Sequence, residues 1–267
     1  MSWGYSEIDG PHTWHKIFPQ AAGPRQSPID VNTARVTSDT SLHSQPLQWR
    51  YVPGNCKAIA NPGYCWRLDV NGEGSELSGG PLQAHYKLEQ FHAHWGPSSE
   101  KGSEHTVDGQ AYAGELHLVH WNSDKYKSFA EAAGHPDGLA VLGVFLEAGI
   151  KDNDELEKIV KLIPHITHKG QTTDVSNPVD PAKLIPDNKH YWTYLGSLTT
   201  PPCTESVIWI LFKEPIPISE RQLSVFRSIK RVGADEVHCD AEDANIICNY
   251  RPPLPLGNRE LRECGHH

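Results

Sequence analysis

Four stretches of the chain carry the pattern of hydrophobic and polar residues that is typical of β-strands. Lys87 to Trp95 and Glu115 to Trp121 alternate between polar and apolar side chains, whereas Leu139 to Leu146 and Ser206 to Phe212 are almost continuously apolar. Residues two apart on a strand point to the same face, so a continuous apolar run indicates a strand that is buried on both faces. Turn sequences such as Asn71-Gly72 separate the strands.

Two short helices are predicted among these strands. Asp154 can cap a segment whose apolar stripe consists of Leu156, Ile159, Val160 and Ile163. Ser219 and Gln222 form a capping-box pattern ahead of a second stripe, Leu223 and Phe226. Both stripes are expected to face the core. The whole pattern predicts a large, mostly antiparallel sheet with short peripheral helices.

The length of the chain, 267 residues, is compatible with one domain or two. Glycine and proline are scattered along the sequence, and neither a linker-like run nor an internal repeat divides it. We therefore expect one domain over residues 1–267. A domain of this size buries enough apolar surface to shape a deep pocket.

Charge and hydropathy argue against two classes of partner. The net charge is −9, whereas nucleic-acid binding needs clustered lysine and arginine to neutralise phosphates. The longest apolar run, Leu139 to Leu146, has eight residues and is too short to span a bilayer. The start Met1-Ser2-Trp3 lacks the basic flank and apolar core of a signal peptide, so we expect a cytoplasmic protein.

The strongest chemical signal lies in the two alternating strands. Gln90, His92 and His94 share one face of the first strand, and Glu115 and His117 share one face of the second. Three imidazoles that converge from two strands, with a fourth position open, are a known way of holding a catalytic zinc ion. Gln90 and Glu115 can each accept a hydrogen bond from a histidine nitrogen that is not bound to metal, which fixes the tautomer and the ring direction.

Two simpler origins could account for this histidine pattern. A His-x-His pair arises by chance fairly often in a chain with 16 histidines. A structural zinc site would close its fourth position with cysteine or histidine, and no Cys-x-x-Cys spacing occurs here. The surrounding residues therefore favour an open site. A separate pair, His266-His267, could bind metal only loosely.

The chain resembles an α-class carbonic anhydrase over nearly its whole length. The resemblance rests on a series of segments in the family's order: Trp3-Gly4-Tyr5, Arg25-Gln26-Ser27-Pro28, Gln90 to Gly96, Gly102 to Asp108, Glu115 to Asn122, Asp137 to Gly143, Tyr191 to Tyr194, Gly196 to Pro202, and Asn249-Tyr250-Arg251-Pro252. Several loop segments are most similar to the cytosolic enzymes of insects. The resemblance implies a mainly β fold (α+β by some schemes) with a single twisted central sheet.

The same resemblance implies a lyase that reversibly hydrates CO₂ to bicarbonate and a proton. Zn²⁺ bound by His92, His94 and His117 would acidify a water molecule, and the hydroxide so formed would attack the carbon of CO₂. The carbonyl of Asn249 is implied as the acceptor that holds His94. Partners are then limited to CO₂ and bicarbonate, without nucleic acid or membrane, and we expect a monomer.

Thr199 and Glu104 are implied to orient the hydroxide. The Thr199 hydroxyl can accept a hydrogen bond from it only if its own proton is donated onward, and Glu104 matches the family's acceptor. Taken alone, Thr199 would be an ordinary loop residue and Glu104 a solvated turn carboxylate, so only the joint match assigns them this role. His105 and Tyr194 match positions that brace the same loop.

CO₂ is small and apolar, so it needs a dry wall beside the metal. The residues that match the family's substrate site are Val119, Val141, Leu198, Thr199, Thr200, Val207 and Trp209. On pattern alone the apolar members would be read as core residues. Val119 is an exception, because it shares a strand face with His117.

Proton export is where the chain departs from the fastest members of the family, which carry a histidine as a shuttle. Tyr64 occupies that position here. A phenol with a reference pKa of about 10 must ionise before it accepts a proton, so we expect Tyr64 to be a poor shuttle. Arg67 nearby could lower the pKa of Tyr64 or attract bicarbonate.

Cysteine usage agrees with a reducing compartment. Six cysteines are too few for a disulfide framework in a chain of this length. Secreted members of the family join a cysteine that matches Cys203 to one near the N-terminus, and that second position matches Ala21 here. Pairing among the other cysteines stays open from sequence.

Two other functions remain possible from sequence. A carbonic-anhydrase-like binding module would keep the fold without the chemistry, but such modules typically lack one or more zinc ligands. A zinc hydrolase acting on esters could use the same hydroxide, at least as a side reaction.

Overall fold

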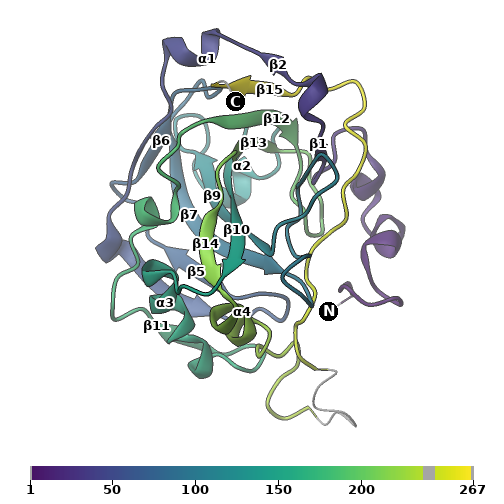
Figure 1. The fold of residues 1–267 in the computed structure, drawn as a ribbon, viewed down its shortest axis with the longest axis vertical. Coiled ribbons are helices and arrows are strands. Elements are labelled where there is room, and N and C mark those ends of the chain that lie inside the picture. The colour runs from purple at the N-terminus through teal and green to yellow at the C-terminus, as the bar shows by residue number, and fades with distance from the viewer. Residues whose placement is uncertain (1, 237–243, 266–267) are drawn as a thin grey trace.

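The computed structural model describes residues 2–236 and 244–265 (Figure 1). Its strands are β1 Asp30–Val31, β2 Thr37–Ser38, β3 Gln48–Arg50, β4 Cys56–Ala60, β5 Arg67–Val70, β6 Glu76–Ser78, β7 Tyr86–Trp95, β8 Thr106–Val107, β9 Gly114–Asn122, β10 Leu139–Gly149, β11 Thr172–Asp174, β12 Tyr191–Gly196, β13 Val207–Phe212, β14 Ile216–Ser219 and β15 Arg262–Cys264. The α-helices are α1 Ser41–Ser44, α2 Phe129–Ala132, α3 Asp154–Val160 and α4 Glu220–Phe226. Short 3₁₀ helices are η1 Pro11–Lys16, η2 Pro19–Ala22, η3 Thr33–Arg35, η4 Pro53–Asn55, η5 Ile163–His165 and η6 Pro181–Leu184.

One large twisted sheet organises the molecule and confirms the predicted mainly β fold. Its strands run in the order β11-β4-β5-β7-β9-β10-β13-β12-β15-β2, with β14 beside β10, β3 beside β6, and β6 beside β7. Most neighbours are antiparallel, but β10 pairs in parallel with β13 and with β14, and β15 pairs in parallel with β2. The sheet is therefore mixed, although predominantly antiparallel.

Both faces of the central strands are covered, and strand periodicity decides which side chains go to which face. On β10, Ala140, Leu142 and Val144 belong to the larger apolar core, whereas Val141 and Phe145 belong to a smaller cluster. On β13, Ile210 and Phe212 face the larger core, and Val207, Trp209 and Leu211 face the smaller cluster. Burial on both faces explains the continuous apolar sequences of these two strands.

Strand β7 contains an irregularity that simple alternation does not predict. Its register against β9 shifts between Leu88 and Gln90. Before the shift Leu88 packs in the larger core, and after it Phe91 and Ala93 do. An extra residue in one strand moves all later side chains to the other face. Gln90 is thereby separated from Leu88 and shares the opposite face with His92.

The two predicted helices are present and pack together near β14 (Figure 1). Helix α4 has the predicted capping box, with reciprocal bonds between Ser219 and Gln222. The predicted cap of α3 was wrong by one residue. Asn153 is the N-cap, because its side-chain oxygen accepts the Glu155 and Leu156 N–H groups, and Asp154 is the first helical residue.

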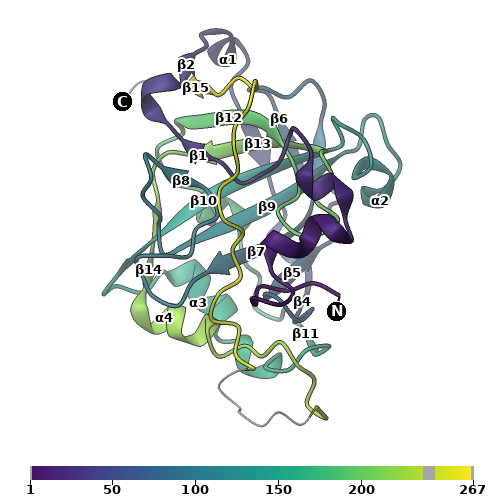
Figure 2. The same ribbon diagram turned by 90° about the vertical axis from the view of Figure 1, so that its right-hand side faces the viewer.

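The N-terminal and C-terminal segments run past the same side of the sheet (Figure 2). The Arg251 guanidinium joins them, since it donates to Gln26 Oε1 and to the carbonyl oxygens of Ser27 and Ala21. Ala21 packs in one buried cluster with Cys203, as the family resemblance implied for these two positions. The five cysteines in the described ranges are free thiols. No helix in residues 2–236 and 244–265 combines the length and the apolar character needed to cross a membrane.

The capping box of α4 can be tested by Ser219→Ala. This change removes the acceptor for the Gln222 N–H, and we expect it to lower the free energy of unfolding by about 1 kcal/mol. Ser224→Ala, at an exposed site on the same helix, is the matched control and should stay within about 0.5 kcal/mol of the parent. Urea denaturation measures both, and equal losses would contradict the assigned cap.

Candidate metal centre

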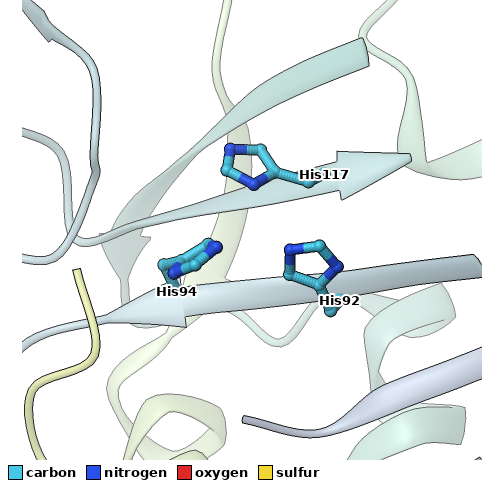
Figure 3. A group of neighbouring side chains, drawn as sticks. All are labelled: His92, His94 and His117. Atoms are coloured by element: carbon cyan, nitrogen blue, oxygen red, sulfur yellow. The ribbon is translucent and has the colours of Figure 1, made fainter. Parts of the chain in front are cut away.

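The three histidines predicted as metal ligands meet across two adjacent strands. His92 and His94 lie on β7 and His117 lies on β9, where His92 pairs directly with His117 (Figure 3). Their ring centroids are 4.7–5.3 Å apart. One nitrogen from each ring lies within 4.8 Å of the other two. Strand pairing therefore brings together residues that are 23–25 positions apart in sequence.

Hydrogen bonds determine which nitrogen of each ring is free. His92 donates from Nδ1 to Gln90 Oε1 at 2.8 Å, and His94 donates from Nδ1 to the Asn249 carbonyl at 2.7 Å. His117 donates from Nε2 to the Glu115 carboxylate. The lone pairs left over are on Nε2 of His92, Nε2 of His94 and Nδ1 of His117, and all three acceptors are those that the sequence analysis named.

The free nitrogens suit a zinc ion. Burial lowers the pKa of His92 well below its usual range, lowers that of His94 to about 3, and lowers that of His117. The rings are therefore neutral at physiological pH, the state in which imidazole binds metal. His94 Nε2 is buried without a hydrogen-bond partner, which is costly unless the atom has a ligand to bind. Three neutral imidazoles with an unsatisfied buried nitrogen fit Zn²⁺.

Glu115 holds His117 through a carboxylate that is itself fully engaged. One of its oxygens accepts the N–H groups of Glu104 and His105, and the other accepts from His105 Nδ1 at 2.8 Å and from His117 Nε2. Burial by itself would raise the pKa of Glu115, but His105 and His117 lower it below its usual range. Glu115 is thus an ionised acceptor and not a free ligand.

His105, Glu115 and His117 also form a cluster with metal-ligand residue types. The hydrogen bonds within this cluster already use His105 Nδ1, His117 Nε2 and the Glu115 oxygen between them, and Tyr194 Oη bonds His105 Nε2 at 2.6 Å. We therefore assign this cluster a bracing role. The pair His266-His267 lies outside the described residues.

Glu104 lies directly beside the histidines. Its Oε2 accepts the Arg251 N–H at 2.8 Å, and its Oε1 is 3.1 Å from His94 Nε2 and has no hydrogen-bond partner. Burial and the nearby Glu115 charge raise the pKa of Glu104 well above its usual range, although hydrogen bonds from the Arg251 N–H and the Thr199 side chain act in the opposite direction. A cation at the three histidines would favour the ionised carboxylate.

A chain of buried hydroxyl groups connects this cluster to the loop that carries Thr199. Tyr194 Oη bonds both His105 and Ser27 Oγ, and Ser27 Oγ accepts the Ser197 N–H at 3.0 Å. Gly196 lies where a side chain does not fit, because a Cβ there would come within 2.0 Å of Ser27 Oγ. The predicted bracing residues His105 and Tyr194 therefore do contact the machinery that positions the loop.

A cavity of about 70 Å³ opens beside the histidines. The predicted site residues that line it are Tyr64, Gln90, His92, His117, Val119, Val141, Leu198, Thr199, Thr200 and Trp209. His94, Glu104, Glu115 and Asn249 are buried behind this surface. Val207 does not line the cavity, but it is buried in the same apolar cluster as Val119, Val141 and Trp209.

Three further residues line the cavity: Arg67, which the sequence analysis named only as a neighbour of Tyr64, and Cys65 and Phe129, which it missed. Arg67 stands three positions after Tyr64 in the sequence, and it is the one charged residue among those that line the described cavity. Phe129 begins the four-residue helix α2, for which the sequence pattern had no signal. Its place in the cavity depends on how α2 packs against β9.

Tyr64 is held at the cavity by contacts on several sides. Its ring lies against Trp3, with centroids 4.9 Å apart, and its carbonyl accepts from Asn249 Nδ2 at 2.8 Å. Burial raises the pKa of Tyr64 to about 12, and the lowering by Arg67 does not offset this rise. Arg67 therefore does lower the pKa of Tyr64, as the sequence suggested, but burial has the larger effect and the phenol is neutral near pH 7.

The chain is similar to known proteins over nearly its whole length. Residues 9–265 match the family described as eukaryotic-type carbonic anhydrase. Carbonic anhydrase 7 of Homo sapiens is 45% identical over 262 residues, which cover 97% of this chain and 96% of the relative. Carbonic anhydrase 3 of Bos taurus is 44% identical with 97% of each chain covered, and carbonic anhydrase 1 of Monodelphis domestica is 42% identical with 98% and 97% covered.

The metal centre predicts one tightly bound zinc ion per chain. His94→Ala removes the buried unpartnered nitrogen, so we expect it to lose most of its zinc and its activity. His15→Ala, an exposed histidine on η1, is the control and should keep both. Metal analysis after dialysis against a weak chelator measures retention. Full zinc and full activity in His94→Ala, or a crystal structure with Glu115 bound to the metal, would refute the ligand assignment.

Proposed function

The chain belongs to the eukaryotic-type carbonic anhydrase family, and from this premise we propose that His92, His94 and His117 form its zinc centre. The enzyme is a zinc-dependent lyase that reversibly hydrates CO₂ to bicarbonate and a proton. The observation that carries the proposed site is the cluster of three histidines, in which one nitrogen of each ring lies within 4.8 Å of the other two and Nε2 of His94 is buried without a hydrogen-bond partner.

Zinc bound at this centre would act as a Lewis acid and generate a nucleophile from water near neutral pH, an effect for which carbonic anhydrases are themselves the reference case. The chain's own contribution is orientation. Gln90, Asn249 and Glu115 fix the three ring directions by accepting one hydrogen bond each. Fixed ring directions keep the metal ligands in place without reorganisation during turnover.

Thr199 and Glu104 are proposed to orient the nucleophile. Thr199 lines the cavity, and its side chain lies near enough to Glu104 behind it to lower the pKa of that carboxyl. The Thr199 hydroxyl can accept from the nucleophile only while it donates its own proton to Glu104. The Arg251 N–H holds the second Glu104 oxygen, so the acceptor cannot turn away.

CO₂ is proposed to bind against the apolar side of the cavity, which Val119, Val141, Leu198 and Trp209 line. Val207 supports this wall from within the cluster, and Thr200 contributes its side chain at the loop. A dry surface suits a substrate without a net dipole and disfavours the charged product. Bicarbonate is thus more weakly held by the wall than CO₂ is.

We propose that Tyr64 exports protons slowly or does not export them at all. Its phenol has a pKa raised to about 12 by burial, so it cannot take up and release a proton near neutral pH as an imidazole does. The enzyme is then limited by proton export when buffer is dilute. The chemical step, in which the nucleophile attacks CO₂, is not slowed by this limit.

Further proposals concern the domain organisation, cellular location and oligomeric state of the enzyme. One domain over residues 1–267 is supported by the continuous sheet and by the family match over residues 9–265. A cytoplasmic location is supported by the free Cys203 thiol, which packs against Ala21. A monomer and the likeness of loop segments to insect enzymes stay predictions.

A binding module without catalysis is disfavoured by the site. One nitrogen of each of the three histidines lies within 4.8 Å of the other two, and the Thr199 side chain is near enough to Glu104 to lower its pKa. Hydrolysis of esters can accompany CO₂ hydration, because both reactions use the same nucleophile. Assays of both reactions on one preparation distinguish the three functions.

The orientation step is tested by Thr199→Ala and Glu104→Gln. Each change should lower CO₂ hydration about a hundredfold, or roughly 3 kcal/mol of transition-state stabilisation. Since the two residues form one relay, the double variant should lose much less than the sum of the single losses. Stopped-flow measurement of CO₂ hydration gives the three rates, and strict additivity would show that the residues act independently.

Proton export is tested by Tyr64→His. An imidazole at this position titrates near neutral pH, so we expect kcat at low buffer to rise while kcat/KM is largely preserved. Imidazole buffer should likewise raise kcat of the parent enzyme. Tyr64→Phe is the matched control and should leave kcat unchanged, because the parent phenol is already unable to exchange protons. No rise in Tyr64→His would show that another group exports the proton or that chemistry is limiting.

A further inference from the structure

A proline-rich segment near the C-terminus lies outside the site described above. Its sequence from residue 251 is Arg-Pro-Pro-Leu-Pro-Leu, and residues 246–256 contain no helix, strand or turn. In Figure 2 this part of the chain, coloured yellow, runs past the side of the sheet that faces the viewer. None of residues 252–256 lines the cavity beside the histidines.

The prolines restrict the backbone of this segment to the polyproline II conformation. A proline ring holds φ at about −65°, and a residue that precedes a proline is confined to extended conformations. Arg251, Pro252 and Leu254 each precede a proline. A chain restricted in this way forms an extended left-handed helix with three residues per turn.

Side-chain burial follows the period of three that such a helix requires. Arg251 is buried and Leu254, three positions later, is half-buried, whereas Pro252 and Pro255 are both exposed. Pro253 is exposed as well. The segment therefore has an inward face with Arg251 and Leu254 and an outward surface of proline rings. We call Pro252, Pro253 and Pro255 the proline ridge.

The inward face holds the proline ridge in place. The Leu254 N–H donates to the Pro28 carbonyl at 2.9 Å, and the Arg251 guanidinium donates to the Ser27 carbonyl at 2.9 Å. Leu256 packs against the smaller apolar cluster. The backbone of the ridge is thus ordered before any partner binds, so binding does not pay for ordering it. These attachments use only the inward face, and they leave the exposed prolines without a role.

Positive charge lies at the Pro255 end of the ridge. The Arg259 guanidinium donates to the carbonyls of Pro255 and Leu195, and the Leu195 side chain is 49% exposed. Burial lowers the pKa of Arg25, the Glu205 carboxylate raises it, and the nearby Arg259 charge lowers it. Glu205 also acts on Arg259. One carboxylate therefore lies near two guanidinium groups, which leaves an excess of positive charge beside the prolines.

From the period of three, the exposed prolines and the adjacent positive charge, we propose that the proline ridge is a docking surface for a partner protein. The partner is a domain with an aromatic-lined groove, the design by which WW and SH3 domains bind Pro-x-x-Pro segments. The rings of Pro252 and Pro255 pack into the groove, and carboxylates at its edge face Arg25 and Arg259. The interaction does not rest on the proposed function, because the ridge and the cavity share no residue.

The test is calorimetric titration of the intact, zinc-loaded protein with a panel of purified WW and SH3 domains. We expect at least one domain to bind with a Kd between about 1 μM and 1 mM. Pro252→Ala and Pro255→Ala should each weaken that binding at least about tenfold, since each removes a ring from the centre of the contact. Pro178→Ala, an exposed proline between β11 and η6, is the matched control and should bind as the parent does.

Free polyproline supplies a second measurement on the parent protein. It occupies the same aromatic groove, so it should displace the parent from the domain that binds it. This competition also replaces the ridge variants if either of them fails to fold, which zinc content and urea denaturation reveal.

Three results would overturn the proposal. One is that no domain of the panel binds the parent with a Kd below about 1 mM. Another is binding that survives both Pro252→Ala and Pro255→Ala in folded protein. The third is binding that excess polyproline does not displace.

Discussion

The buried carboxylate of Glu115 is the interaction on which the metal centre depends. It accepts hydrogen bonds from two backbone N–H groups and two histidine rings, so that a charge with no solvent exposure is satisfied by protein donors alone. It fixes His117 with Nε2 as the donor, and the Nδ1 lone pair must then face His92 and His94. Removing this carboxylate would leave buried donors unsatisfied, each at a cost of about 1–3 kcal/mol.

Two buried carboxyl groups near each other have opposite protonation tendencies, and this difference separates their roles. His105 and His117 lower the pKa of Glu115 despite its burial, whereas burial and the Glu115 charge raise the pKa of Glu104. Environments that push two pKa values apart are a general means of giving similar groups distinct functions. Glu115 serves as a permanent acceptor, and Glu104 responds to charge placed at the histidines.

Segments near both ends of the chain position the groups that surround the histidines of the central strands. The Arg251 N–H holds Glu104, and the Arg251 guanidinium bonds the segment from Ala21 to Ser27. Ser27 in turn bonds Tyr194 and Ser197, next to the loop that carries Thr199. Sheet strands are rigid supports for ligands, and these crossing segments bring the orienting groups to them.

The amino-acid sequence by itself determined the strands that carry the site and most of its metal chemistry. The period of two on a strand links Gln90 to His92 and Glu115 to His117, because the partners are two residues apart and share a face. Continuous apolar runs also identified the buried strands that begin near Leu139 and Ser206, to within a few residues. The roles of Asn249, Thr199 and Glu104 came from resemblance, since no local pattern joins them.

Tertiary structure alone decided the features that depend on how distant segments meet. Asn249 reaches His94 across 155 positions, and Arg67 and Phe129 become neighbours of the cavity only through strand order and the packing of α2. The pairing of β7 with β9 likewise decided the register shift that puts Leu88 and Gln90 on opposite faces. Local patterns reflect forces between residues a few positions apart, whereas pairing register and side-chain contacts between remote segments are set by the packing of the whole core.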